Sequence, residues 1–132
     1  MILRSTSLLS LFLILMLLVG CKKDQDSTIS PDLFGVDWFV TQRDAAGNAT
    51  YVPAASAPLS LGQSGFRFES SGTFVEYMPA PADGTTSTPG TWTTTDGQTF
   101  TITVNPPQAA SYTYDLLISA VSSTGLTARR LP

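Results

Sequence analysis

The sequence predicts an all-β domain, a small antiparallel meander of seven or eight strands that closes into a barrel. From Leu33 onward no stretch shows sustained helical periodicity, and β-branched and aromatic residues alternate with polar ones. The intervening segments are mostly of hairpin length, which favours antiparallel neighbours. About eight such strands can remove their exposed edges by closing. A seven-stranded β-sandwich is the alternative architecture.

Alternation of apolar and polar residues locates the individual strands. The first, 35–43, places Trp38 on the apolar face and both Asp37 and Arg43 on the polar face. Residues 112–121 form the longest, with Tyr114 and Ala120 at the two ends of one apolar face. The other strands are expected at 49–52, 66–70, 73–78, 90–95, 98–104 and 126–131, and 59–61 is a candidate for a short additional strand.

Turn residues separate these strands. Asp96-Gly97 is the strongest hairpin signal and predicts a type I′ turn. Residues 79–89 hold three prolines and are expected to form the longest irregular connection of the domain. Glu69 and Glu76 flank a tight turn at 70–73, and we expect both carboxylates to be solvated, because like charges at a hairpin mouth prefer water.

The first twenty residues differ in kind from the rest. Arg4 precedes an apolar run of twelve residues, 8–19, which as a helix would cover roughly 18 Å. That length is short of the ~30 Å hydrocarbon core of a bilayer, so residues 1–20 are interpreted as a signal peptide. The run ends in Leu18-Val19-Gly20-Cys21, and Cys21 is the only cysteine of the chain.

This ending resembles the lipobox of bacterial lipoproteins, in which the cysteine is acylated, for example with palmitate, and becomes the mature N-terminus. The resemblance implies lipidation of Cys21, a polar tether over 21–32, and a location at the bacterial outer membrane, on its periplasmic or cell-surface face. An ordinary secretory signal is the alternative. Asp26-Ser27-Thr28 resembles an acceptor motif for bacterial O-glycosylation, which makes Ser27 a candidate site.

Residues 33–132 resemble the lipocalin-like domains of bacterial lipoproteins. Four segments carry this resemblance: an L-x-G-x-W-type opening, an F-x-x-x-G-T-F hairpin, a G-x-W…D-G hairpin and a closing Y-x-I-type hairpin. They are Leu33-Phe34-Gly35-Val36-Asp37-Trp38, residues 65–74, residues 90–102 and residues 114–126. The resemblance implies a barrel that binds a small apolar ligand. The chain is shorter than the eukaryotic-type lipocalins, so the resemblance does not imply a calyx that encloses the ligand.

The composition of the chain argues against catalysis, metal binding and nucleic-acid binding. Histidine is absent, and the only lysines, Lys22 and Lys23, lie in the tether, so the serines of the domain lack a general base. The lone cysteine and the missing histidines exclude the usual zinc sites, and no cofactor motif is present. A formal net charge of −3 argues against binding to nucleic acid. We therefore expect a protein that is not an enzyme.

Aromatic residues are the informative set. Six of them fall on apolar faces of different strands and converge if the sheet closes: Trp38, Phe66, Phe68, Trp92, Phe100 and Tyr114. Eight-stranded barrels are just wide enough to be filled by side chains or to hold one small ligand. These residues therefore form either a filled core or a ligand pocket. The first case predicts a structural module that contacts an envelope protein, and the second predicts a binding protein for a small apolar molecule.

Overall fold

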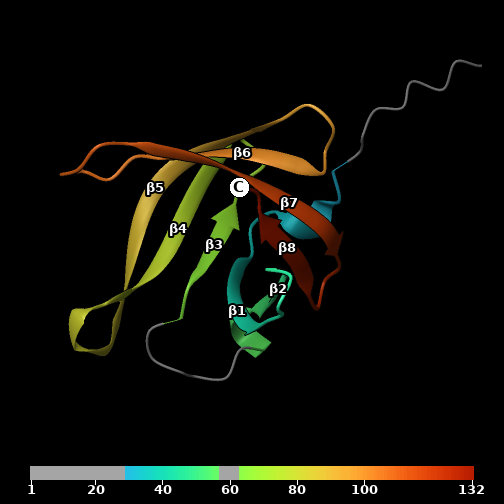
Figure 1. Cartoon of the computed structure of the whole chain (residues 1–132), viewed down its shortest axis with the longest axis horizontal. Coiled ribbons are helices and arrows are strands. Elements are labelled where there is room, and N and C mark those ends of the chain that lie inside the picture. The colour runs from blue at the N-terminus through green and yellow to red at the C-terminus, as the bar shows by residue number, and fades with distance from the viewer. Residues whose placement is uncertain (1–28, 57–62) are drawn as a thin grey trace, which may run out of the picture.

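The computed structural model describes residues 29–56 and 63–132 (Figure 1). The signal peptide, Cys21, Ser27 and the strand expected at 59–61 lie outside the described residues. Within the described part of the chain, no helix has the length and apolar character needed to cross a membrane. Three short 3₁₀ turns are present, η1 (Pro31–Leu33), η2 (Ala54–Ser56) and η3 (Pro81–Asp83).

Eight antiparallel strands close into one barrel. The strands are β1 (Asp37–Arg43), β2 (Ala49–Pro53), β3 (Gly65–Phe68), β4 (Thr73–Ala80), β5 (Gly84–Thr94), β6 (Thr99–Val104), β7 (Tyr112–Val121) and β8 (Leu126–Arg130). This confirms the predicted all-β class and the closed antiparallel barrel, and the sandwich alternative is wrong. Closure pairs every strand on both sides, which satisfies the backbone donors and acceptors that an open edge would expose.

The order of strands around the barrel departs from the chain order at one place. The ring runs β1-β2-β8-β7-β6-β5-β4-β3, so β3 pairs with β1 and β2 pairs with β8. Both β2 and β3 are antiparallel to β1 and therefore run in the same direction. The connection between them crosses β1 instead of forming a hairpin. Alternation patterns assign residues to faces but carry no information about which strand lies beside which.

Aromatic side chains fill one half of the barrel. Phe68 is fully buried, and its ring centroid lies 5.0 Å from that of Phe74, 5.2 Å from Phe100 and 5.4 Å from Phe66. The Phe68–Phe74 and Phe68–Phe100 pairs pack edge-to-face, the geometry that aromatic quadrupoles favour. This cluster is the hydrophobic core of the protein, and it lies toward the end of the barrel where η1 packs.

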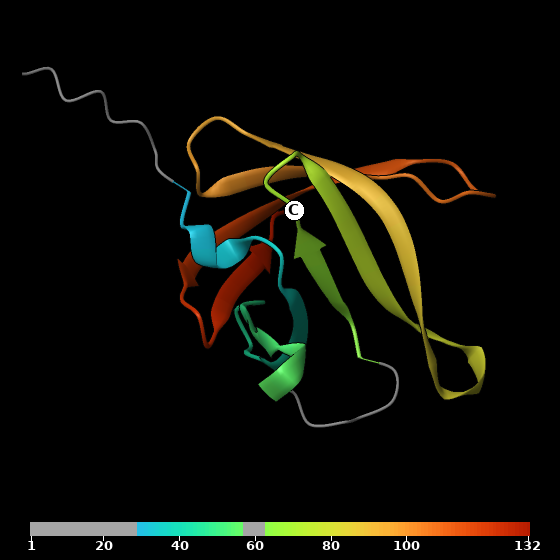
Figure 2. The ribbon, with the colours of Figure 1, turned by 180° about the vertical axis from the view of Figure 1, so that it is seen from behind.

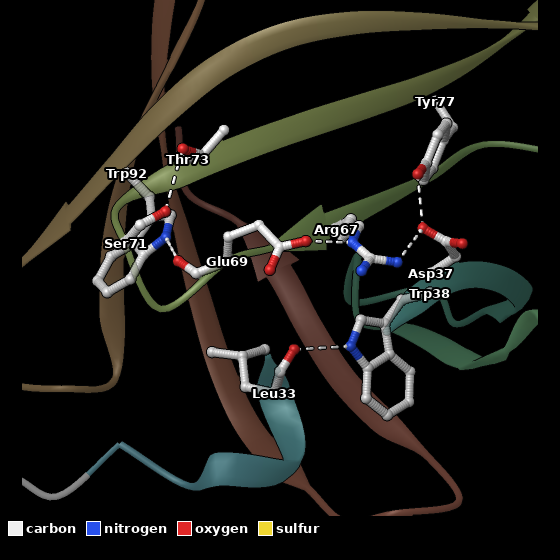
Figure 3. Close-up of polar contacts among 9 residues, drawn as sticks. All are labelled: Leu33, Asp37, Trp38, Arg67, Glu69, Ser71, Thr73, Tyr77 and Trp92. Carbon is white, nitrogen blue, oxygen red and sulfur yellow. Dashed lines mark hydrogen bonds and ion pairs between the residues drawn. The ribbon is translucent and has the colours of Figure 1, made fainter. Parts of the chain in front are cut away.

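The 3₁₀ turn η1 closes that end. Leu33 is 1% exposed, and its carbonyl oxygen accepts a hydrogen bond of 3.2 Å from Trp38 Nε1 (Figure 3). Phe34 stacks on Trp92 at a centroid distance of 5.7 Å, and Trp92 Nε1 donates to the Glu69 carbonyl oxygen at 2.8 Å. Each indole N–H is therefore satisfied by a backbone oxygen, as a buried donor requires.

A polar network joins three strands on the outer surface of the barrel. Arg67 forms ion pairs with Asp37, at 3.3 Å, and with Glu69, and the Tyr77 hydroxyl donates to Asp37 at 2.5 Å (Figure 3). The carboxylates and the guanidinium are about one-third exposed, so solvent screens these pairs and they add little stability. The network joins Asp37 of β1, Arg67 of β3 and Tyr77 of β4 with Glu69, the residue after β3.

The segment 79–89 is not an irregular connection, and that prediction is wrong. Strand β4 continues to Ala80, η3 turns the chain, and β5 starts at Gly84. Pro79 pairs with Thr85 and Pro89 with Val75, so both prolines lie within a regular ladder. Ala82 makes the tight turn by adopting a positive φ of 64°. Figures 1 and 2 show this hairpin reaching well beyond the short strands, on the side away from η1.

The loop at Asp96-Gly97 is a hairpin connection of four residues and not a type I′ turn. A type I′ turn needs positive φ at two successive residues, whereas only Gly97, with φ 72°, has it here. The Asp96 carboxylate accepts hydrogen bonds from the backbone N–H groups of Gln98 and Thr99 at 2.9 and 2.8 Å. These bonds hold the pKa of the Asp96 carboxyl below its ordinary value. They also stabilise the four-residue loop in place of a two-residue turn.

Candidate functional site

The end of the barrel opposite η1 contains a pocket of about 250 Å³. Apolar side chains from β2, β3, β7 and β8 form its floor, and all are at least nine-tenths buried: Tyr51, Phe66, Leu116 and Ala128. Phe66 belongs both to this floor and to the aromatic core beneath it. The pocket therefore lies directly above the aromatic core of the barrel.

Arg43 reaches the pocket because of a β-bulge in β1. The pairing register with β2 shifts between Val40 and Gln42, so that Arg43 pairs with Ala49, which faces the barrel interior. Cross-strand partners share a face of the sheet. The expectation that Arg43 lies on the polar outer face with Asp37 is wrong, because the extra residue of a bulge exchanges the two faces beyond it.

A second bulge acts on β7. The register with β8 shifts between Ile118 and Ala120, which leaves Ala120 exposed rather than on the apolar face predicted for it.

Arg130 lies two residues after the inward-facing Ala128 on β8, so it faces the interior and lies at the mouth of the pocket. Its guanidinium carbon lies 4.0 Å from the centroid of the Tyr114 ring, within the range of a cation–π interaction.

Glu76 is the buried carboxylate of the pocket. It lies on β4 in phase with Phe74, and only 9% of it is exposed, so the expectation of a solvated side chain is wrong. One of its oxygens accepts a hydrogen bond from the Tyr112 hydroxyl, and the other accepts one of 3.1 Å from the Tyr114 hydroxyl. A buried carboxylate needs such donors, and here both come from one strand across the interior.

These contacts keep the tyrosines of the site protonated. Burial and the adjacent Glu76 raise the pKa of Tyr112 to about 12, and the same two causes raise the pKa of Tyr114. Burial also raises the pKa of the Tyr51 hydroxyl on the pocket floor, and the charge of nearby Arg43 opposes that shift. All three hydroxyls are therefore neutral hydrogen-bond donors at physiological pH.

A second cavity of about 260 Å³ lies at the closed end, between η1, the 95–98 loop and the end of β7. Ile29 and Leu33 line one side of it, so it marks where the N-terminal segment joins the barrel. Among the described residues that line it, only Asp96 is charged, and its carboxylate accepts hydrogen bonds from the backbone of its own turn. Its described lining has no arginine and no buried carboxylate, whereas the open-end pocket has Glu76 and two arginines, so the open-end pocket is the better candidate.

The structure divides the six aromatic candidates between core and pocket. Trp38, Phe68 and Phe100 are at most 1% exposed and belong to the core. Trp92 is half-buried at the closed end, far from the pocket floor, whereas Tyr114 lines the pocket. A filled core and an open pocket thus coexist in one barrel, rather than excluding each other.

Three charged residues of the site were not selected from the sequence. Glu76 follows Phe74 by two positions and Arg130 follows Ala128 by two, so strict alternation already places both on inward faces. Arg43 carries no such signal, since a bulge determines its direction. Among the described residues, no group of three acidic, histidine or cysteine side chains is placed to hold a metal ion.

Comparison with protein-family models, with curated proteins and with solved structures finds no match to this chain.

Proposed function

We propose that the protein is a lipid-anchored envelope protein that binds a small molecule with an apolar part in the open-end pocket. The observation that supports binding is the pocket itself, which has an apolar floor beneath a rim of hydrogen-bonding side chains and lies above an aromatic core. Binding sites for small molecules combine these two features, with apolar walls for affinity and a few polar groups for orientation. No catalytic role is proposed for the site.

The proposed anchor would determine which way the pocket faces relative to the membrane. Ile29 and Ser30 line the closed-end cavity, so the tether from Cys21 joins the barrel at the end opposite the pocket. The pocket of an anchored protein would then face away from the membrane, and the ligand would enter from the aqueous side. The alternative function, a module that contacts an envelope protein, has less support, because it was expected for a filled barrel and the open end holds a pocket.

A titration followed by NMR tests binding. The mature chain from residue 21, with Cys21→Ser to keep it soluble, is titrated with the neutral apolar probe N-phenyl-1-naphthylamine. We expect saturable shifts that cluster on open-end residues such as Met78, Leu116 and Ala128. Shifts confined to Ile29, Gln98 and Ala120 would place binding in the closed-end cavity instead. The absence of saturable shifts in a folded protein would disprove the binding function.

The anchor has its own test. Changing Cys21 to Ser in the full chain should abolish metabolic labelling by a palmitate analogue and release the protein from the membrane fraction, because two or more acyl chains are needed for stable attachment. Ser27→Ala serves as a control that should keep both label and membrane association. Persistence of the label in the Cys21→Ser protein would contradict lipidation at this residue.

A further inference from the structure

More positive than negative side chains line the open-end pocket. Arg43, Glu76 and Arg130 line it, two cations and one anion. The two arginines lie on β1 and β8, the strands on either side of β2, whereas Glu76 projects from β4. Each carboxylate oxygen of Glu76 already accepts a hydrogen bond from a tyrosine hydroxyl. The rim therefore carries an excess of positive charge on one side.

Neither arginine forms an ion pair with a described carboxylate. Among the described residues, the ion pairs within 4.0 Å all involve Arg67 on the outer surface, so no carboxylate pairs with Arg43 or Arg130. Arg130 is held by its cation–π contact with Tyr114, which leaves the N–H edges of the stacked guanidinium available to an acceptor. Arg43 lies close enough to Tyr51 on the pocket floor for its charge to oppose the rise that burial causes in the pKa of the Tyr51 hydroxyl.

The pocket also limits the size of its occupant. Its volume of about 250 Å³ is below the roughly 300–1,000 Å³ of sites that enclose drug-sized molecules. The aromatic core beneath Phe66 prevents deeper entry. A compact apolar body fits above the floor, whereas a long chain would extend past the rim into solvent.

We infer that the ligand is a small amphipathic anion, a carboxylate with a compact apolar body. Its apolar part lies on Tyr51, Phe66 and Leu116, and its carboxylate binds the guanidinium groups of Arg43 and Arg130. This inference rests on the proposed binding function and adds the charge and size of the ligand. Guanidinium N–H groups match carboxylate oxygens in geometry, and two such groups at one rim favour an anion over a neutral molecule of equal size.

Three ligands that share one chain length test the inference: octanoate, 1-octanol and octylamine. Each is titrated into the mature chain carrying Cys21→Ser, and the NMR shifts of pocket residues give the affinities. We expect octanoate to bind about tenfold or more tightly than octanol, the advantage of one charge-assisted hydrogen bond over a neutral one. Added salt should weaken octanoate binding and leave octanol binding unchanged.

Paired variants locate the effect. In the double variant Arg43→Gln and Arg130→Gln, the advantage of octanoate over octanol should fall about tenfold or vanish, while octanol affinity stays within about twofold. The double variant Arg67→Gln and Arg129→Gln removes the same formal charge away from the pocket and should keep the advantage. Arg130→Gln alone, compared with Arg129→Gln alone, provides the same contrast if either double variant does not fold.

The outcomes separate the two proposals. If octanol and octanoate bind the pocket equally, or if octylamine binds more tightly through Glu76, the binding function stands and the anionic ligand is disproved. The same holds if both double variants lose the preference to the same extent. If none of the three ligands shifts pocket residues, the proposed binding function fails with it.

Discussion

Replacing Phe68 by alanine is expected to lower the free energy of unfolding by about 3–5 kcal/mol, the usual cost of deleting a fully buried aromatic side chain. Phe68 is 0% exposed and lies at the centre of the aromatic cluster, with four other rings at centroid distances of 5.0 to 6.0 Å. Neighbouring strands are joined by backbone ladders around a closed ring, which restricts their collapse into the cavity. Urea denaturation followed by tryptophan fluorescence measures the loss.

Phe39 provides a matched control for this prediction. It lies on the outer face of β1, is half-buried, and stacks on Tyr77 at a centroid distance of 5.2 Å. Phe39→Ala removes the same atoms, but solvent fills the space, so we expect less than half of the loss seen at Phe68. Phe68→Leu should give an intermediate value if the alanine protein is too unstable to measure. Equal losses at positions 39 and 68 would contradict the placement of the core inside the barrel.

Gly65→Ala is expected to destabilise the protein by about 1–3 kcal/mol or more, the range for atoms forced into a packed site. A Cβ at Gly65 would lie 2.0 Å from the backbone oxygen of Trp38 and 3.0 Å from Cδ1 of Phe39. The backbone oxygen has no room to move without separating β1 from β3, the pairing that closes the ring. Hydrogen exchange should show faster opening of the β1–β3 amides than of the β6–β7 amides.

Gly125 provides the comparison for the same substitution. The nearest heavy atom to a Cβ at Gly125 is the Tyr51 carbonyl oxygen at 3.7 Å, an ordinary van der Waals contact. Gly125→Ala is therefore expected to change the free energy of unfolding by no more than about 0.5 kcal/mol. If Gly65→Ala is also neutral, β1 and β3 do not approach each other as closely as described. The comparison separates the steric effect from the general difference between glycine and alanine.

Residue patterns alone predicted much of the barrel. Period-two alternation placed all eight strands, since one buried face makes the pattern visible. It gave β7 its observed limits, Tyr112 and Val121, and made β4 and β5 too short. It also identified Trp38 and Phe100 as inward residues. The fold class followed because short strands with hairpin-length turns leave few other ways to bury one face. The N-terminal signal, read from the same sequence, stays a prediction.

Other features depend on contacts between distant segments. The pairing of β3 with β1 and the regular ladder through Pro79 and Pro89 were not predictable, because alternation is the same whichever strand lies alongside. The site shows this most clearly. Glu76 and Arg130 follow the alternation of their own strands, but Arg43 faces the pocket only because the β1 bulge adds a residue against β2. Local pattern determines which face a residue belongs to, and tertiary pairing decides where that pattern shifts and which faces meet.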